Sequence, residues 1–230
     1  MSKPTIILSL ESAGNICSAS ISINNVISAT FSVYLANKHD KLLAEFAKRL
    51  LNDLDISITE LDAVAVSAGP GSFTGLRISG SIAKAMCFGG TPNLIAVPNL
   101  MAFAYNCYKN INNNVFLRNS KENNTINKII ATIKAQKDLL YFQEFSNEFI
   151  ALNEPKLVAQ DYFQQNDASN SIFCGSAAYL FPKYNIDINS INFSAELISN
   201  LANEMLSKGE FTSPDEYTPM YFQDFNPKKI

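Results

Sequence analysis

VSAGPGSFTGLRISG, at residues 66–80, has four glycines, an arginine and several small residues directly after a short apolar segment. A glycine-rich turn between a strand and a helix can bind phosphate, because backbone amides at a helix N-terminus attract anions. A Walker phosphate loop needs Lys and a hydroxyl residue after its last glycine, but Leu76 and Arg77 follow Gly75. The dinucleotide fingerprint GxGxxG also fails, since Thr74 stands at the third glycine position. Anion binding at the helix N-terminus stays a hypothesis that no sequence motif supports.

The same stretch is also typical of a sharp turn followed by a closely packed helix. Gly69, Pro70 and Gly71 predict the turn, and Ser72 or Thr74 can cap a helix over 76–88. Every fourth residue of that helix is small, so another backbone can lie against one nearly smooth face. These small residues are Gly75, Ser79 and Ala83. An apolar stripe beside them should also be buried against something, and it consists of Ile78, Ile82, Ala85 and Met86.

Short apolar or alternating segments around this stretch predict five strands. They cover residues 5–10, 17–23, 27–33, 62–67 and 94–97. The pair Asn24-Asn25 predicts a tight hairpin, because Asn tolerates positive φ. Helices are predicted over 39–54, where leucines recur at the helical period, and from Pro98 to about residue 108. An antiparallel meander feeding crossover helices indicates an α/β fold with a mixed sheet, as in ribonuclease H-like and actin-like proteins.

The second half of the chain predicts another α/β unit. Residues 110–127 are rich in Asn and Lys and poor in apolar side chains, which indicates a mobile loop or a domain junction. Strands are predicted over 129–135, 139–145 and 171–175, and a helix over 194–207 with Ser194 as its N-cap. We therefore expect two tandem domains, 1–108 and 109–230. The helix over 194–207 can pack back on the first domain.

Composition excludes several classes of protein. The formal net charge is −3 and the lysines are spread along the chain, so RNA should be bound through a partner and not by this chain alone. No window approaches the roughly 20 apolar residues that span a bilayer, and no secretory signal is recognisable, so we expect a cytoplasmic protein without membrane contact. The four cysteines form no CxxC pair, which argues against a zinc site or a disulfide framework. We expect no metal and no cofactor.

Two titratable residues are candidates for chemistry. His39 is the chain's one histidine, so a two-histidine metal site is impossible, and its place at the start of a helix favours a capping or solvated side chain. Glu11 ends the first strand, where actin-like phosphotransferases place a carboxylate for magnesium-bound phosphate. The alternative is a loop carboxylate that accepts hydrogen bonds from nearby amides. Neither residue is followed by a catalytic motif.

Five segments carry a resemblance to a known family. The run AGPGSFTGLRISGSIAKAM, the strand end LSLES and the helix start HDKLLAEF resemble the TsaB (YeaZ) family of tRNA threonylcarbamoyladenosine biosynthesis proteins. IIATIKAQKDLLYFQEF is similar to the family's second-domain strand pair, and PMYFQDF to its closing segment. The resemblance implies a two-domain actin-like (ASKHA) fold and a non-catalytic scaffold in the complex that makes t6A in tRNA.

In that family, TsaB assembles with the catalytic transferase TsaD, and the ATPase TsaE joins them. The tRNA is bound through the complex, and TsaB alone can form a homodimer. The resemblance implies that the two helices flanking the fourth strand contact TsaD. The interface residues would be Leu42, Leu43, Phe46, Leu50, Gly75, Leu76, Ser79, Ala83 and Met86. A vestigial anion or nucleotide site would comprise Glu11, Gly71, Ser72 and Arg77.

This chain departs from the family pattern at three positions. Glu11 stands where Asp is usual, Gln136 replaces an Arg, and Gln223 stands where Arg is usual. Each departure weakens the case for a retained nucleotide or second-domain ligand. The alternative function is a free-standing actin-like ATPase or small-molecule kinase that uses Glu11 and the glycine-rich turn.

Overall fold

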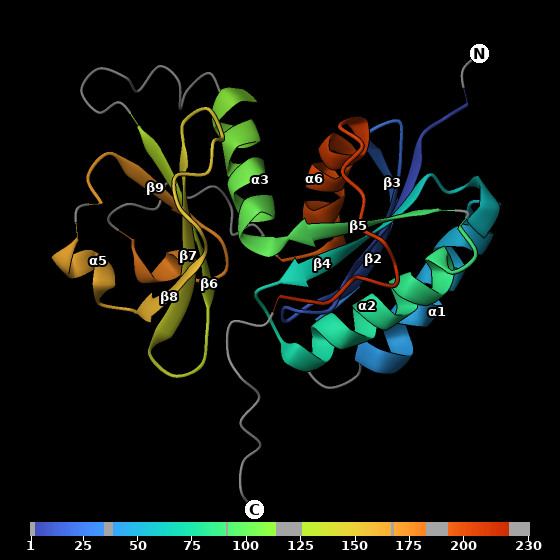
Figure 1. Ribbon diagram of the computed structural model, residues 1–230, viewed down its shortest axis with the longest axis horizontal. Helices are drawn as coiled ribbons and strands as arrows, with labels where there is room; N and C mark the ends of the chain where they lie inside the picture. Colours follow the sequence, from blue (N-terminus) through green and yellow to red (C-terminus); the bar gives the residue numbers. More distant parts are fainter. Residues whose placement is uncertain are drawn as a thin grey trace, which may run out of the picture.

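The computed structural model describes residues 3–34, 39–90, 92–113, 126–166, 168–182 and 193–220; at 39–41 and 165 it describes the backbone alone. Within these ranges two mixed sheets carry helices on their faces (Figure 1). The predicted fold class, mixed sheets flanked by helices in an α/β arrangement, is confirmed.

The first sheet has five strands in the order β3-β2-β1-β4-β5. β1 pairs antiparallel with β2 and parallel with β4, which in turn is parallel to β5. Asn24 and Asn25 join β2 to β3 with φ of 52° and 66°, so the predicted hairpin is confirmed. The strands are β1 (Ile6–Glu11), β2 (Cys17–Ile23), β3 (Val26–Val33), β4 (Ala63–Gly69) and β5 (Asn93–Pro98).

In the described part of the chain, four long helices are arranged around the first sheet. Two cover one face, and a helix from the far end of the chain covers the other, while a fourth stands between the two sheets (Figure 1). The first two are α1 (His39–Asp53) and α2 (Phe73–Cys87); the others are α6 (Ala195–Ser207) and α3 (Asn99–Asn113). A 3-10 turn, Ile58–Glu60, precedes β4.

The second sheet has four strands in the order β8-β7-β6-β9. β6 is antiparallel to β7 and parallel to β9, and β7 is antiparallel to β8. The strands are β6 (Lys128–Lys134), β7 (Leu139–Ser146), β8 (Lys156–Ala159) and β9 (Ser171–Cys174). A short helix, α5 (Tyr162–Gln165), and a 3-10 turn, Ala178–Leu180, complete this half.

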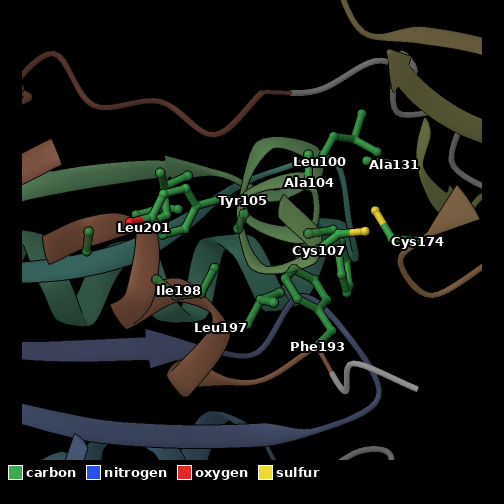
Figure 2. Close-up of a cluster of buried hydrophobic side chains, with 14 of the residues drawn as sticks. Leu100, Ala104, Tyr105, Cys107, Ala131, Cys174, Phe193, Leu197, Ile198 and Leu201 are labelled. Carbon is green, nitrogen blue, oxygen red and sulfur yellow. The ribbon is translucent and has the colours of Figure 1, made fainter. Parts of the chain in front are cut away.

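α6 belongs spatially with the first sheet. Its first amide, Ala195 N, donates to Ser18 Oγ of β2 at 2.8 Å, and Asn203 Nδ2 donates to Ser22 Oγ at 3.2 Å. Leu197, Ile198 and Leu201 share a buried cluster with residues of β4, β5 and α3 (Figure 2). Ser194 holds the predicted N-cap position, although its side chain makes no cap hydrogen bond.

The element boundaries differ from expectation most clearly at α2 and α3. α2 starts at Phe73, three residues early, because Ser72 caps it. α3 continues to Asn113, because the half-buried Ile111 packs on the core, so residues 110–113 are helical and the expected loop is wrong there. β8 was not expected at all. The predicted division between residues 108 and 109 lies inside α3, and the two-domain division stays a prediction.

Candidate partner interface

The glycine-rich turn packs against the loop that follows β1. Ser72 N donates to Ala13 O at 2.8 Å, and Ser12 Oγ donates to Gly75 O at 2.8 Å. A Cβ on Gly71 would come within 2.8 Å of the Ala13 Cβ. The sequence predicted that another backbone could lie against the smooth face of this helix. That backbone is the chain's own, at Ser12 and Ala13.

Ser72 and Arg77 complete the start of α2. Ser72 is the N-cap, and its Oγ accepts a hydrogen bond from Gly75 N at 3.3 Å, as one of the two expected caps should. The Arg77 guanidinium lies 4.0 Å from the centroid of the Phe73 ring, a cation–π contact on the surface. Both side chains are therefore used locally.

Glu11 is completely buried at the end of β1. Its Oε1 accepts hydrogen bonds from Ala13 N at 2.6 Å and Gly14 N at 2.9 Å, while Oε2 has no partner among the described residues. Burial raises the pKa of Glu11 well above its usual range, although the hydrogen bonds from the Gly14 and Ala13 amides act in the opposite direction. Of the two interpretations offered by the sequence, the structure places Glu11 as a carboxyl that binds the amides of its own loop.

Each of the four residues expected to form an anion site therefore makes a separate structural contact. Glu11 occupies the two amides that an anion would need in the loop after β1, and Ser72 engages α2 and Ala13. Gly71 is half-buried against Ala13, and Arg77 points to the surface over Phe73. The close contact of the two loops uses the Ala13, Gly14 and Ser72 amides within the chain itself.

Seven of the nine expected interface residues lie inside the monomer, which corrects the predicted contact surface. α1 buries Leu43, Phe46 and Leu50 against the first sheet, with exposed fractions of 0%, 8% and 1%. The α2 residues Gly75, Leu76, Ser79 and Ala83 are also buried. Leu42 and Met86 are half-buried and pack on the same core. The physical reason is that the buried faces of α1 and α2 both point to the first sheet. The sequence shows that these faces are apolar or small, but not whether they meet the sheet or a partner.

The outward face of α2 has an unusual composition for a surface helix. It is formed by small and apolar residues, with Arg77 and Lys84 at its margin, whereas the outward face of α1 carries Glu45, Lys48 and Arg49. Phe88, just beyond the helix, is 83% exposed. We call this face the outer α2 stripe; Thr74, Ser81, Ala85 and Phe88 are exposed on it, and Ile78 and Ile82 are half-buried and also pack on the core of the first sheet. Ile78, Ile82 and Ala85 were visible in the sequence as an apolar stripe, but Phe88 was missed.

The segment before residue 220 packs on the side of α2 that carries Gly80 and Lys84. Tyr217 is buried, its hydroxyl donates to Ser67 O at 3.1 Å, and Lys84 Nζ donates to Tyr217 O at 3.1 Å. A Cβ on Gly80 would come within 2.7 Å of the Tyr217 ring. Met220 N donates to Ala68 O at 2.7 Å. Gly80 is therefore covered by this segment, while Gly75 is covered by the loop after β1.

Other sequence candidates contribute less. In the described part of the chain, no three His, Cys, Asp or Glu side chains are grouped as a metal site would require, and no helix there is long and apolar enough to cross a membrane. Gln136 is exposed in the turn between β6 and β7. The His39 side chain and Gln223 lie outside the described residues.

Comparison with known proteins addresses the family of the chain. Residues 33–120 match a family model described as TsaD, tRNA N6-adenosine threonylcarbamoyltransferase. The TsaB protein of Escherichia coli K12 is 25% identical over 142 residues, which cover 62% of this chain and 55% of the relative. The TsaB protein of Haemophilus influenzae is 27% identical over 110 residues, covering 48% and 41%. The predicted resemblance to the TsaB family is confirmed.

Two further proteins are similar to this chain. The N6-adenosine threonylcarbamoyltransferase of Staphylococcus carnosus is 32% identical over 121 residues, covering 46% of this chain and 35% of that protein. The solved structure of YeaZ from Pseudomonas aeruginosa matches with a TM-score of 0.73 at 19% identity, covering 95% of this chain and all of that one, which supports the fold. The matches span about half the length of the curated TsaB relatives.

Proposed function

We propose that this chain is a non-catalytic subunit of a tRNA threonylcarbamoyladenosine (t6A) biosynthesis complex, where it binds and activates a TsaD-type transferase. The observation that carries the proposal is the outer α2 stripe, a low-charge surface on a chain whose relatives are named for this biosynthesis. A contiguous apolar surface on a soluble protein marks an interaction site, and here it is formed by the exposed Ala85 and Phe88 and the half-buried Ile78 and Ile82.

The outer α2 stripe suits a protein partner with a helical surface. Ser81 and Ala85 are short, so a neighbouring helix can approach closely, and Phe88 with the exposed parts of Ile78 and Ile82 supplies apolar area around them. The charged outer face of α1 flanks the stripe and would form a polar rim. A TsaD-type protein or, when the chain is alone, a second copy of it would occupy this surface.

The remaining parts of the proposal concern what the chain does not do by itself. With a net charge of −3 it would bind tRNA through the complex, and an ATPase of the TsaE type would join the pair in the cytoplasm. One histidine in the whole chain rules out a two-histidine metal site on this subunit. A free-standing ATPase or kinase is disfavoured, because Glu11 accepts hydrogen bonds from the amides of its own loop and the glycine-rich turn packs on that loop.

Reconstitution tests this function. TsaD, TsaE, the enzyme that makes the threonylcarbamoyl adenylate, unmodified tRNA, threonine, bicarbonate and ATP are mixed with and without this chain, and t6A is quantified by mass spectrometry of digested tRNA. We expect modification with the full set, and none from this chain and the adenylate-forming enzyme without TsaD. Equal t6A yield with and without this chain would refute the proposal. Steady ATP hydrolysis by this chain alone, abolished by Glu11→Ala, would favour the enzymatic alternative.

A further inference from the structure

Two thiols from separate parts of the fold meet between the sheets. Cys107 lies on α3 and Cys174 ends β9, and their exposed fractions are 0% and 6%. Figure 2 shows the two sulfur atoms turned toward each other across the gap between α3 and the second sheet. The two side chains are hydrogen-bonded to each other. The chain's other cysteines, Cys17 and Cys87, belong to the core under α1 and α2, away from this pair.

The backbone on both sides of the thiol pair is held firmly. Cys174 pairs with Ala131 of β6, and its carbonyl oxygen accepts a hydrogen bond from Thr132 Oγ1 at 3.0 Å. The next residue, Gly175, has a φ of +96°, and a Cβ there would overlap with Thr132 O, so the backbone after Cys174 packs closely on β6. Cys107 is in the middle of a regular helix. The two sulfur atoms are therefore positioned by rigid elements and not by flexible loops.

The surroundings of the pair control its reactivity. The neighbouring side chains are apolar, among them Leu100, Ala104 and Phe193 (Figure 2). Burial, together with the hydrogen bond from Cys107, raises the pKa of the Cys174 thiol well above its usual range. Thiolates are the reacting species in disulfide exchange, so this pair should be inert while packed and should react slowly, when α3 and β9 separate transiently.

We propose that Cys107 and Cys174 are a reversible oxidation site, converted to an intramolecular disulfide by exchange with a small-molecule disulfide such as oxidised glutathione. One cysteine thiolate attacks the glutathione disulfide, forming a mixed disulfide and releasing one glutathione thiolate. The second cysteine thiolate then attacks the cysteine sulfur of the mixed disulfide and releases the second glutathione. The two cysteines lose two electrons and two protons in total, and two molecules of glutathione carry them away.

The disulfide would tie α3 to the second sheet. α3 also packs on α6 and on the first sheet, so it is the element that both halves share. A covalent bond between Cys107 and Cys174 closes a long segment of chain, which lowers the entropy of the unfolded state. The oxidised protein should therefore unfold at a temperature several degrees higher than the reduced protein.

The experiment is a redox titration of the full chain. The protein is incubated to equilibrium in glutathione buffers of graded ratio, free thiols are alkylated in denaturant, and peptides are mapped by mass spectrometry. We expect one transition with a two-electron slope, a peptide pair linked through Cys107 and Cys174, and a raised melting temperature of the oxidised form. Persistent glutathione adducts, four free thiols at every ratio, or a disulfide that leaves the melting temperature unchanged would overturn the proposal.

Variants separate this pair from general thiol oxidation. Cys107→Ala and Cys174→Ala should each abolish the transition, and Cys87→Ala, which removes a buried thiol of the other core, should leave it intact. Linkage through Cys87 or Cys17 in the mapped peptides would contradict the assignment. Because the mapping is done first on the unaltered chain, the result stands even if one of the alanine variants fails to fold.

Discussion

A Cβ atom on Gly75 would overlap with the carbonyl oxygen of Ser12. Gly75 sits in the first turn of α2 and Ser12 in the loop after β1, so their contact fixes the distance between the helix and the first sheet. The relationship explains why the stretch over 66–80 needs glycine at this position even though no phosphate motif is present.

Gly75→Ala should therefore destabilise the fold by about 2 to 3 kcal/mol, as expected for overpacking against backbone that cannot move away. Denaturant unfolding followed by circular dichroism measures the loss. Thr74→Ala, an exposed neighbour in the same turn, is the matched control and should change stability little. A Gly75→Ala protein as stable as the parent would mean that the loop after β1 can yield.

Glu11→Gln should make the stability of the protein less sensitive to pH. Because burial raises the pKa of Glu11 in the folded state, the carboxyl stabilises the fold fully below its unfolded pKa, and this contribution is lost as the pH rises toward the folded pKa. Gln keeps the amide hydrogen bonds without the charge. The advantage of Glu11→Gln over the parent in the free energy of unfolding should grow from pH 5 to pH 8.

The matched control for that series is Glu60→Gln. Glu60 is exposed, and its backbone hydrogen bond with Ser57 lowers its pKa, so its contribution has the opposite sign and is lost as the pH falls. An advantage of Glu11→Gln that stays constant with pH would show that the carboxyl is ionised in the fold throughout that range.

Ala85→Glu should weaken binding to a TsaD-type partner at least about tenfold, equivalent to about 1.4 kcal/mol. The side chain lies in the outer α2 stripe and is exposed, so the monomer can accept the charge while a packed interface cannot. Isothermal titration calorimetry measures the affinity. Ala159→Glu, the same change at an exposed position on β8, is the control. Identical affinities for both variants would move the interface elsewhere.

Tyr217→Phe should cost about 1 kcal/mol, because Ser67 O loses its hydrogen bond from the tyrosine hydroxyl. Tyr217→Ala should cost about 3 to 5 kcal/mol, since the ring fills the space over Gly80. Thermal and denaturant unfolding separate the two. Equal losses in both variants would indicate that the hydroxyl, and not the packing of the ring, holds the segment before residue 220.

Much of the fold could be predicted because local patterns agreed with tertiary packing. The alternation in residues 17–23 and the Asn24-Asn25 turn predicted a hairpin that the structure confirms. The loop prediction for the start of the asparagine tract was wrong because Ile111 packs on the core. This one apolar contact extends α3 into a segment whose composition favours a loop. β8, a short half-exposed edge strand, is too brief for its pattern to be informative.

The direction that a helix faces was beyond the sequence. Ser79 and Ala83 could equally have met a partner or the chain's own sheet, since both need small side chains. In the structure Ser79 is fully buried and donates to Gly75 O at 3.2 Å, so a bulky residue there would disrupt α2 and not a partner contact. The contact that decided the question, with Ser12 and Ala13, lies about sixty residues away in the chain.

α6 has a consequence for how the protein is made. The sheet formed by residues 6–98 leaves Ile7, Ala63 and Ala65 without cover until Ala195–Ser207 arrives, because these side chains share one cluster with α6. Residues up to Ser207 must leave the ribosome before that face is covered. The nascent chain therefore exposes the apolar face of an incomplete sheet until α6 has been made. Its early survival should depend on chaperones that bind such surfaces.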